Sequence, residues 1–235
     1  MEGLAVSLGY DRSCTVSSSG RSGGLCVFWK NYIQLEIKNE SKCHIDCVIT
    51  EPDEEQWRLT CFYVEANRSL RYLTWDMMKF LRSTSTLVWA CIGDFNECLR
   101  SEEQLGPNER DTSQIAAFRE AVDLCALSDI GYSGVDWTFE KKVRGGDYCR
   151  VQPYCVLATA EWSERFPFAS VEHLTAVKSD HCPILLVNEM VTNSVRTAWE
   201  KPFRYECMWE SHGSFEGVLE EAWNAMPMCS NVSAM

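Results

Sequence analysis

Residues 87–92 form an uninterrupted apolar run, Leu-Val-Trp-Ala-Cys-Ile, which stops abruptly at Gly93-Asp94-Phe95-Asn96. An apolar run of this length without polar alternation is typical of a strand that is buried on both faces. Polar residues that follow such a strand fall in a loop at the edge of the sheet, where functional residues concentrate. The segment therefore predicts the centre of a sheet and places a candidate site immediately after it.

The rest of the chain predicts shorter strands and three helices around this central strand. Helices that interrupt pairs of adjacent strands favour an α/β sandwich over a doubly wound parallel sheet. Residues 1–188 are expected to form this domain, and residues 189–235 a tether with a helical segment near 215–225. Residues 100–112 are charged and are expected to form an exposed loop. The predicted strands are 25–30, 32–37, 44–49, 57–64, 137–139, 170–174 and 181–187, and the predicted helices are 69–81, 160–166 and a segment that starts at Ser113.

Spacing within these elements predicts which faces are buried. Ser69 and Ser113 are the predicted N-caps of the first two helices. Apolar residues make up 46% of the chain, which is enough for a real core and too much for a disordered protein. The side chains expected in that core are Trp57, Leu59, Cys61 and Tyr63 of strand 57–64, Leu70, Leu73, Met77 and Phe80 of the first helix, and Ile115, Phe118 and Val122 of the second.

Several features predict an intracellular protein that is neither secreted nor embedded in a membrane. The 13 cysteines are scattered and odd in number, and the four histidines lack zinc-finger spacing, so reduced thiols are expected. The start, MEGLAVSLGY, lacks the basic and long apolar regions of a secretory signal. No apolar run reaches the roughly 18–20 residues that a membrane span needs. Nuclear and cytoplasmic locations both stay open.

The net charge of −12 bears on nucleic-acid binding. A protein that binds DNA tightly without sequence preference usually carries a basic stripe, and the sequence contains no cluster of Lys and Arg. The acidity does not exclude a nuclease, because a metal site is itself built from carboxylates. The charge therefore argues only against tight, non-specific DNA binding.

Two polar corners are the candidate sites. Asp94 and Asn96 follow the central strand, and Asp180 and His181 begin the last predicted strand. In extended chain Asp94 and Asn96 would face one side, where a carboxylate could hold metal or water and an amide could hold phosphate. An Asp-His pair offers a metal ligand and a general base or phosphate contact. Singly, each pair is explained as well by Asx turns or a structural histidine, but both in one chain favour function.

The two corners resemble the GDFN and SDHxP motifs of the endonuclease/exonuclease/phosphatase superfamily, which includes DNase I and the abasic-site endonucleases. The resemblance extends over roughly residues 3–225 and is closest to the endonuclease of LINE-type retroelement polyproteins. The further segments that carry it are Gly20-Arg21-Ser22-Gly23-Gly24-Leu25, Phe28-Trp29, Thr60-Cys61-Phe62-Tyr63, Ala117-Phe118-Arg119-Glu120, Ala158-Thr159-Ala160-Glu161-Trp162 and the tether-like Lys201-Pro202-Phe203-Arg204-Tyr205-Glu206.

The resemblance implies a four-layer, DNase-I-like α/β sandwich that hydrolyses a DNA phosphodiester with one Mg²⁺ (or Mn²⁺) ion. It implies that Asp94 orients or deprotonates the attacking water and that Asn96 holds the phosphate. Asp180 would lie at the metal, and His181 would contact the scissile phosphate. The implied role of Tyr63 is donation to a phosphate oxygen, and that of Thr138 is contact with the substrate. The reverse transcriptase of such polyproteins is absent from this chain, and the oligomeric state stays open.

Three departures from the family pattern imply reduced or lost activity. The family's first strands and its metal-binding Glu precede the segment that residues 1–8 match, and Glu2 is too close to Gly9 to replace that Glu. The Asp that orients the family's catalytic His falls on Tyr154, and the Gly after the catalytic Tyr is Val64. Absent first strands would also leave strand edges unpaired. The alternatives are a phosphatase of small phosphoesters and a non-catalytic binding or structural remnant of the same fold.

Overall fold

The computed structural model describes residues 2–18, 23–106, 110–142, 148–176 and 179–188, together with Gly217. The chain divides into two compact units, Met1–Thr192 and Asn193–Met235, and every element named below lies in the first. Apart from Gly217, the predicted tether 189–235 lies outside the described residues, and so do residues 20–22 of the glycine-rich motif. Both therefore stay predictions.

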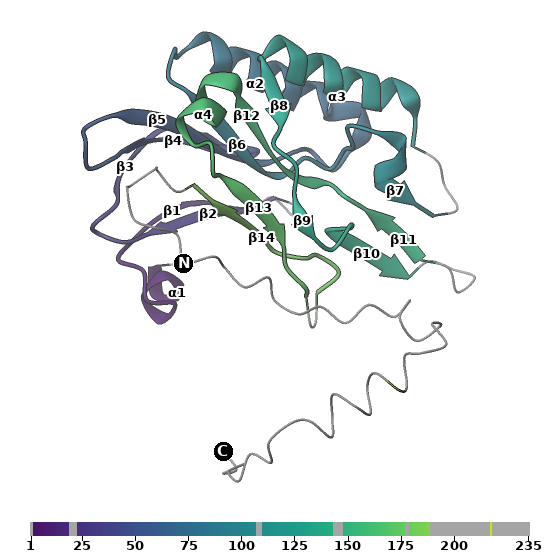
Figure 1. Ribbon diagram of the computed structural model, residues 1–235, viewed down its shortest axis with the longest axis horizontal. Helices are drawn as coiled ribbons and strands as arrows, with labels where there is room; N and C mark the ends of the chain where they lie inside the picture. Colours follow the sequence, from purple (N-terminus) through teal and green to yellow (C-terminus); the bar gives the residue numbers. More distant parts are fainter. Residues whose placement is uncertain are drawn as a thin grey trace. The chain divides into compact units, whose positions relative to one another are not determined.

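A six-stranded sheet forms the centre of the first unit, in the order β3-β4-β5-β6-β12-β8 (Figure 1). Neighbouring strands are antiparallel except β5 and β6, which run parallel. The inner strand β6 has Trp89, Ala90 and Cys91 fully buried, which confirms the central strand predicted from residues 87–92. The strands are β3 (Gln34–Ser41), β4 (His44–Thr50), β5 (Gln56–Tyr63), β6 (Trp89–Asp94), β12 (Tyr154–Thr159) and β8 (Leu127–Asp129).

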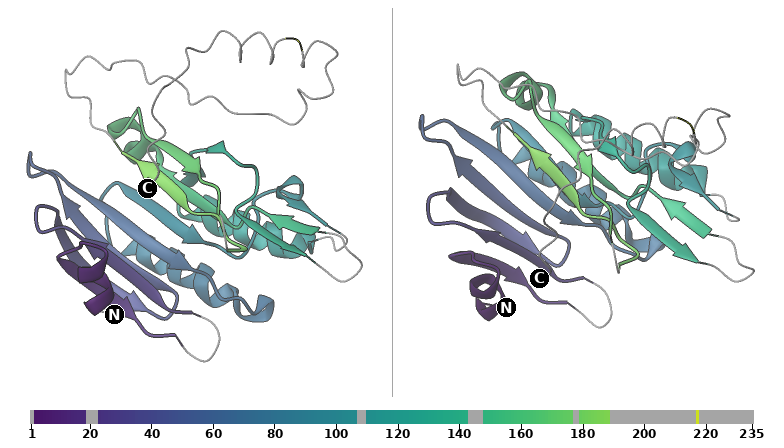
Figure 2. Two further views of the ribbon diagram at one scale, coloured as in Figure 1. Left: turned by 90° about the horizontal axis from the view of Figure 1, so that it is seen from below. Right: turned by 60° about the horizontal axis from the view of Figure 1, so that its bottom comes forward.

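Three smaller sheets accompany the central one (Figure 2). They are β1 (Arg12–Val16) with β2 (Leu25–Trp29); β14 (Ile184–Val187), β13 (Ser170–His173) and β9 (Ser133–Gly134); and β10 (Phe139–Lys142), β11 (Tyr148–Val151) and β7 (Gln104–Leu105). The last predicted strand, 181–187, is shorter than expected because Pro183 has no N–H to donate to a ladder. His181 makes only an isolated antiparallel bridge with Phe139. The expected loop 100–112 contains β7 and a short 3₁₀ turn, η2 (Ser101–Glu103).

Helices α2 (Tyr72–Ser83) and α3 (Thr112–Leu124) cover one face of the central sheet (Figure 1). Their packing centres on Trp75, whose ring stacks on that of Phe118 with centroids 4.7 Å apart. This contact rotates α2 away from the predicted face, so Leu73 and Phe80 are exposed, whereas Thr74, Trp75, Met78 and Leu81 are buried. The predicted face of α3 is confirmed, with Ile115, Phe118 and Val122 buried.

Both predicted N-caps were wrong. The N-cap of α2 is Arg71, whose side chain makes no capping hydrogen bond, and the N-cap of α3 is Asp111. Asn67 caps the 3₁₀ turn η1 (Arg68–Leu70), where its Oδ1 accepts from the Ser69 N–H. Asp111 caps α3 and accepts from the Ser113 N–H.

A second core lies on the opposite face of the central sheet. It contains Trp57, Ala90 and Ala158, together with Trp162 of α4 (Ala160–Arg165) and Phe166, which follows that helix. Leu186 of β14 packs against this core. Because both faces are covered, strand β5 is not the half-buried strand that its alternation predicted. Arg58, Thr60 and Phe62 are more deeply buried than Leu59, Cys61 and Tyr63, and Arg58 makes a two-pronged ion pair with buried Asp46 at 2.7 and 2.8 Å. The sheet is thus sandwiched, as a layered α/β fold requires.

The layer opposite α2 and α3 is divided. Among the described residues, β2 pairs only with β1 and β14 only with β13, so each has an open edge. Leu25 of β2 and Ile184 of β14 line one cavity of about 450 Å³ between them. The expected absence of the family's first strands stays a prediction. The remaining helix, α1 (Glu2–Ser7), lies beyond β1, and no helix in the described part of the chain is long and apolar enough to cross a membrane.

Candidate active site

Parallel pairing of β5 and β6 brings Tyr63 and Asp94 side by side at the ends of the two strands. Gly93 makes this possible. Its φ is +152°, and a Cβ built on it would lie 1.9 Å from the carbonyl oxygen of Phe62. A side chain at this position would therefore force β5 and β6 apart, which gives the glycine of Gly93-Asp94-Phe95-Asn96 a structural reason.

Asp94 is almost fully buried, at 5% exposure. Its Oδ1 accepts from the backbone N–H of Asn96 at 2.9 Å. Burial raises the pKa of the Asp94 carboxyl, while that N–H, His181 and two nearby arginines act in the opposite direction. A buried carboxylate with a raised pKa is suited to accept a proton near neutral pH.

Asn96 closes a tight turn. The sequence had suggested extended chain at this position, and that expectation was wrong. Its φ is +50°, a left-handed conformation that Asn tolerates better than most residues. The side-chain Nδ2 donates to the carbonyl of Val64 at 2.8 Å and ties the turn to the end of β5. An amide nitrogen carries two hydrogens, so one donor is left for a ligand.

His181 lies against two aromatic rings rather than beside a carboxylate that could orient it. Its ring centroid is 4.8 Å from that of Phe139 and 5.5 Å from that of Tyr154, which meets it edge-on. Its Nδ1 is buried and has no hydrogen-bond partner among the described residues. Asp180 approaches Nε2 only to 4.0 Å and has a half-exposed side chain. Tyr154, the residue that the resemblance aligns with an orienting Asp, thus packs edge-on against His181.

Thr138 lies behind the site. Its side chain is fully buried, and its Oγ1 accepts from the backbone N–H of Tyr154 at 3.2 Å. Its carbonyl accepts from the N–H of Cys182 at 2.8 Å. In this position Thr138 joins the segments of Tyr154 and His181, which differs from the substrate contact that the resemblance implies.

Four of the six predicted residues share one cavity. Tyr63, Asp94, Asn96 and His181 line a hollow of about 320 Å³, and three of them also line the 450 Å³ cavity between β2 and β14. Asp180 and Thr138 line neither. The sequence missed Arg68 and Arg110, which line the smaller cavity with Gln104.

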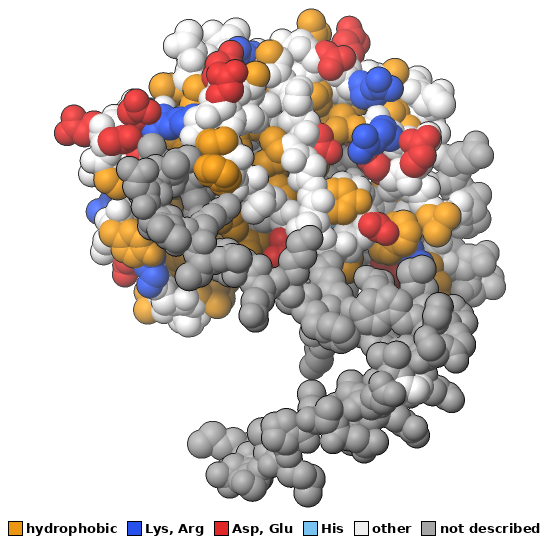
Figure 3. Space-filling model, viewed as in Figure 1, with side chains coloured by type: hydrophobic (Ala, Val, Ile, Leu, Met, Phe, Trp, Pro, Cys, Tyr) orange, Lys and Arg blue, Asp and Glu red, His pale blue; other side chains and the backbone are white. Residues whose placement is uncertain are grey.

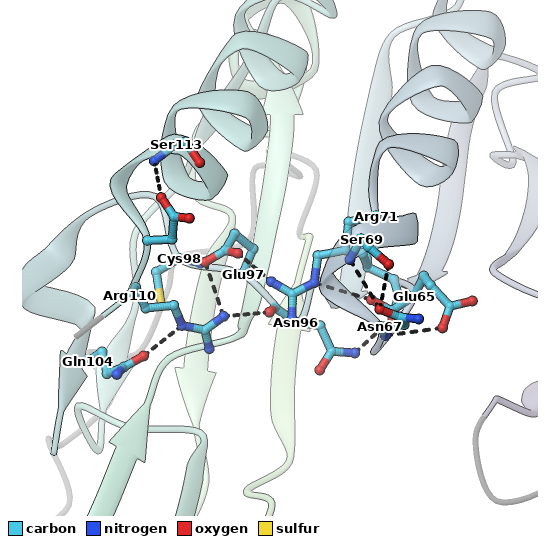
Figure 4. A network of polar contacts seen from close by, with 12 residues as sticks. Glu65, Asn67, Ser69, Arg71, Asn96, Glu97, Cys98, Gln104, Arg110 and Ser113 are labelled. Atoms are coloured by element: carbon cyan, nitrogen blue, oxygen red, sulfur yellow. Dashed lines mark hydrogen bonds and ion pairs between the residues drawn. The ribbon is translucent and has the colours of Figure 1, made fainter. Parts of the chain in front are cut away.

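A buried ion-pair network holds the site turn (Figure 4). Glu97 lies between Arg71 and Arg110 and bonds to both, with side-chain exposures of 1%, 5% and 11%. Nη1 of Arg110 also donates to the carbonyl of Asn96 at 2.8 Å. The only signal in the sequence was the position of Glu97, directly after Asn96.

The described residues do not form a ready metal site. No group of three or more His, Cys, Asp and Glu side chains in the described ranges could hold a metal ion. Hard cations such as Mg²⁺ are held by carboxylate and other oxygens. Asp94 and Asp180 supply such oxygens, but one side chain is buried in the cavity wall and the other is half-exposed outside it. These residues alone therefore do not fit a resident ion.

Comparison with solved structures decides the fold. The endonuclease domain of TRAS1, a telomere-specific non-LTR retrotransposon, matches with a TM-score of 0.61 and 13% identity, over 77% of this chain and 81% of that one. The AP endonuclease LMAP from Leishmania major matches with a TM-score of 0.54 and 14% identity, over 68% of this chain and 64% of that one. The chain has the DNase-I-like fold.

The catalytic domain of Xenopus laevis APE2 has the same DNase-I-like fold, with a TM-score of 0.52, 13% identity and 78% of each chain covered. No family model matches the sequence, and no curated protein matches it. At these identities the likeness concerns the DNase-I-like fold and leaves the chemistry to the residues of the site.

Proposed function

We propose that this domain is a phosphodiester hydrolase of the retroelement-endonuclease kind, with DNA as substrate and with strongly reduced or lost activity. The observation that carries the proposal is the convergence of Tyr63, Asp94, Asn96 and His181 on one cavity of a DNase-I-like fold. These side chains offer a base, two neutral donors and an imidazole, which together suit in-line attack of water on a phosphodiester.

Each residue has a role that its surroundings support. Asp94 accepts the proton of the attacking water, since its burial raises its pKa toward that of an effective base. The second N–H of the Asn96 amide and the hydroxyl of Tyr63 donate to the phosphate oxygens. His181 contacts the same phosphate through Nε2, because Nδ1 faces the protein interior.

Two observations support reduced activity. The Nδ1 atom of His181 has no hydrogen-bond partner in the described part of the chain, so no hydrogen bond fixes the tautomer of the ring. In a serine protease, loss of the orienting carboxylate costs roughly 10⁴-fold in rate. The second observation is the absence of a three-ligand group among the described residues. Mg²⁺ or Mn²⁺ would have to be held mainly by water and by the substrate's own phosphate oxygens.

The test is nicking of supercoiled plasmid by purified protein with Mg²⁺ or Mn²⁺, with EDTA as the blank. The control is the doubly substituted Asp94→Ala, His181→Ala protein. Slow, metal-dependent nicking by the wild type alone is the expected result. Rapid nicking would contradict the reduced activity, and nicking that survives the double substitution would contradict the assigned site.

A phosphatase of small phosphoesters is distinguished with two chromogenic substrates. Bis(p-nitrophenyl) phosphate is a diester and p-nitrophenyl phosphate a monoester, so a preference for the monoester would favour the phosphatase.

A non-catalytic remnant is the second candidate, favoured by the unoriented His181. It would bind DNA without nicking it. If Asp94→Ala changes that binding, the site still contacts the ligand, and if it does not, the scaffold binds elsewhere or is only structural.

A further inference from the structure

The cavity that holds the four site residues has a basic wall. Arg68 and Arg110 line it with Asn96 and Gln104, whereas Phe139, Tyr154 and His181 line it with their rings. The chain as a whole carries a net charge of −12. On the described residues of the face in Figure 3, Lys and Arg side chains lie singly or in small groups among Asp and Glu and form no stripe. The positive charge of this wall therefore contrasts with the acidity of the chain as a whole.

Arg110 is fixed before any ligand arrives. Its Nε donates to Gln104 Oε1 at 2.6 Å, and its Nη1 donates to the carbonyl of Asn96 at 2.8 Å and to Glu97 Oε1 at 3.1 Å. These bonds leave Nη2 without a partner among the described residues, at the edge of a side chain that is 11% exposed and lines the cavity. A guanidinium held in this way loses little conformational entropy when it binds an anion.

The charges beneath the wall do not cancel. Glu97 is a single carboxylate that neutralises only one of its two partners, Arg71 and Arg110, so the buried triad keeps one net positive charge. Arg68 adds a second charge, since it makes no ion pair in the described ranges. Its place is set by η1, where Asn67 Oδ1 accepts from the N–H and hydroxyl of Ser69 at 3.1 and 2.9 Å. Among the described residues, Asp94 is the one acidic side chain that lines the cavity.

We propose that Arg68 and Arg110 bind a backbone phosphate of a DNA strand next to the one that His181 and Asn96 contact. The proposal rests on the proposed function and specifies how the substrate is held. Arginine is suited to this role because its planar fork matches the oxygens of a phosphate. A second phosphate beside the first is a property of a nucleic-acid strand and not of a small phosphomonoester. The two arginines therefore favour binding of a nucleic-acid strand over a small phosphomonoester.

The test is binding of a short fluorescein-labelled DNA duplex, followed by fluorescence anisotropy over a range of salt concentrations with EDTA present. Arg68→Ala and Arg110→Ala should each weaken binding and reduce the slope of log K against log salt by about 0.9, the contribution of one phosphate contact. Arg119→Ala is the matched control, because Arg119 is exposed on α3, outside the cavity, and loses the same charge. Its slope should equal that of the wild type.

Arg110→Ala also removes a buried ion-pair partner, so Arg68→Ala and Arg110→Lys keep the test independent of folding. Arg110→Lys keeps the charge and should preserve the slope while it weakens binding. A slope for Arg68→Ala equal to that of Arg119→Ala would overturn the proposal, and so would absence of DNA binding by the wild type. Displacement of DNA by inorganic phosphate, but not by chloride at equal ionic strength, would assign the wall to small phosphates and also overturn it.

Catalysis and binding are read separately in these experiments. A protein that binds DNA through the two arginines but never nicks plasmid has lost its hydrolase activity and still supports the wall. If the wild type nicks plasmid but Arg68→Ala leaves the slope of log K against log salt unchanged, the proposed phosphate contact is refuted and the hydrolase is not.

Discussion

Replacement of Glu97 by Gln is expected to destabilise the domain strongly. Glu97 has 1% of its side chain exposed and bonds to Arg71 and Arg110, which are themselves almost buried. Glutamine has the same shape, but its charge is gone, and its NH₂ group is a donor that would face guanidinium donors. Two buried positive charges would then lack a counter-charge, together with the Asn96 carbonyl that Arg110 holds.

The magnitude follows from the burial of the triad. Removal of one partner from a buried ion pair costs about 3–5 kcal/mol, because the remaining charge is desolvated without compensation. A domain of this size loses roughly 2–4 °C of Tm per kcal/mol, so Tm should fall by about 6–20 °C. Against a total stability of about 5–15 kcal/mol, the loss is a large fraction of the whole.

Thermal unfolding followed by circular dichroism measures this change. Glu102→Gln is the matched control, because Glu102 is a neighbouring glutamate in the same charge state but is fully exposed. Its Tm should stay close to that of the wild type. If Glu97→Gln lowers Tm no more than Glu102→Gln, the two arginines find solvent or other partners, and the triad does not hold the site turn.

The same substitution should act on DNA binding in the opposite direction. Glu97→Gln adds one positive charge beneath the wall of Arg68 and Arg110, so at a temperature where the protein is folded, low-salt affinity should rise. Weaker binding by a folded Glu97→Gln protein would mean that geometry, not charge, limits the wall.

Four further predictions follow from other contacts. Gly93→Ala should lower the stability by more than about 4 kcal/mol, because its Cβ would meet the carbonyl of Phe62 at 1.9 Å, and a soluble protein with unchanged Tm in calorimetry would contradict the close approach of β5 and β6. Asp94→Asn should stabilise the domain at pH 7 by about 0.5–2 kcal/mol. Because the folded pKa of Asp94 is raised, its carboxylate costs stability above that pKa, and the gain should shrink in urea titrations as pH falls through it. Burial raises the pKa of the Cys98 thiol to about 12 and that of Cys125 to about 11, so both should resist iodoacetamide at pH 8 in the native protein and react only after unfolding, as mass spectrometry would show. Leu185→Lys on the open strand β14, where Leu185 is exposed, should lower concentration-dependent light scattering without a change in Tm, and unchanged scattering would exclude this edge as the aggregation site.

The sequence predicted the central strand well and the helix faces less well. An apolar run such as 87–92 is too short for a typical helix and has the length of a strand covered on both faces, so its length decided the prediction. The face of α2 depends on a contact between Trp75 and Phe118, which lie 43 positions apart in the sequence, and helical spacing alone cannot reveal it. The cap of α3 was missed for a local reason, because Asp111 precedes the predicted Ser113 by two residues. Helix α2 begins after the turn η1, at an N-cap, Arg71, that makes no side-chain hydrogen bond.

At the site, the sequence predicted several of the cavity residues but not the contacts that hold them in place. Asp94, Asn96 and His181 come from two motifs, and the structure brings them to one cavity with Tyr63. Arg110 was assigned only to an exposed charged loop, because nothing in its neighbourhood shows that it reaches back to the carbonyl of Asn96.

The described contacts separate residues that the fold needs from residues that only the chemistry needs. Gly93 allows β5 and β6 to pack closely, and Glu97 neutralises a buried arginine. Changes at either position would therefore damage the fold whether or not the domain cuts DNA. Tyr154 differs, because its ring packs edge-on against His181 and needs no carboxylate there. A tyrosine at that position therefore carries little structural penalty. Selection for folding alone would keep Gly93 and Glu97, whereas it would not require the Asp94 carboxylate, whose burial raises its pKa and costs stability at neutral pH.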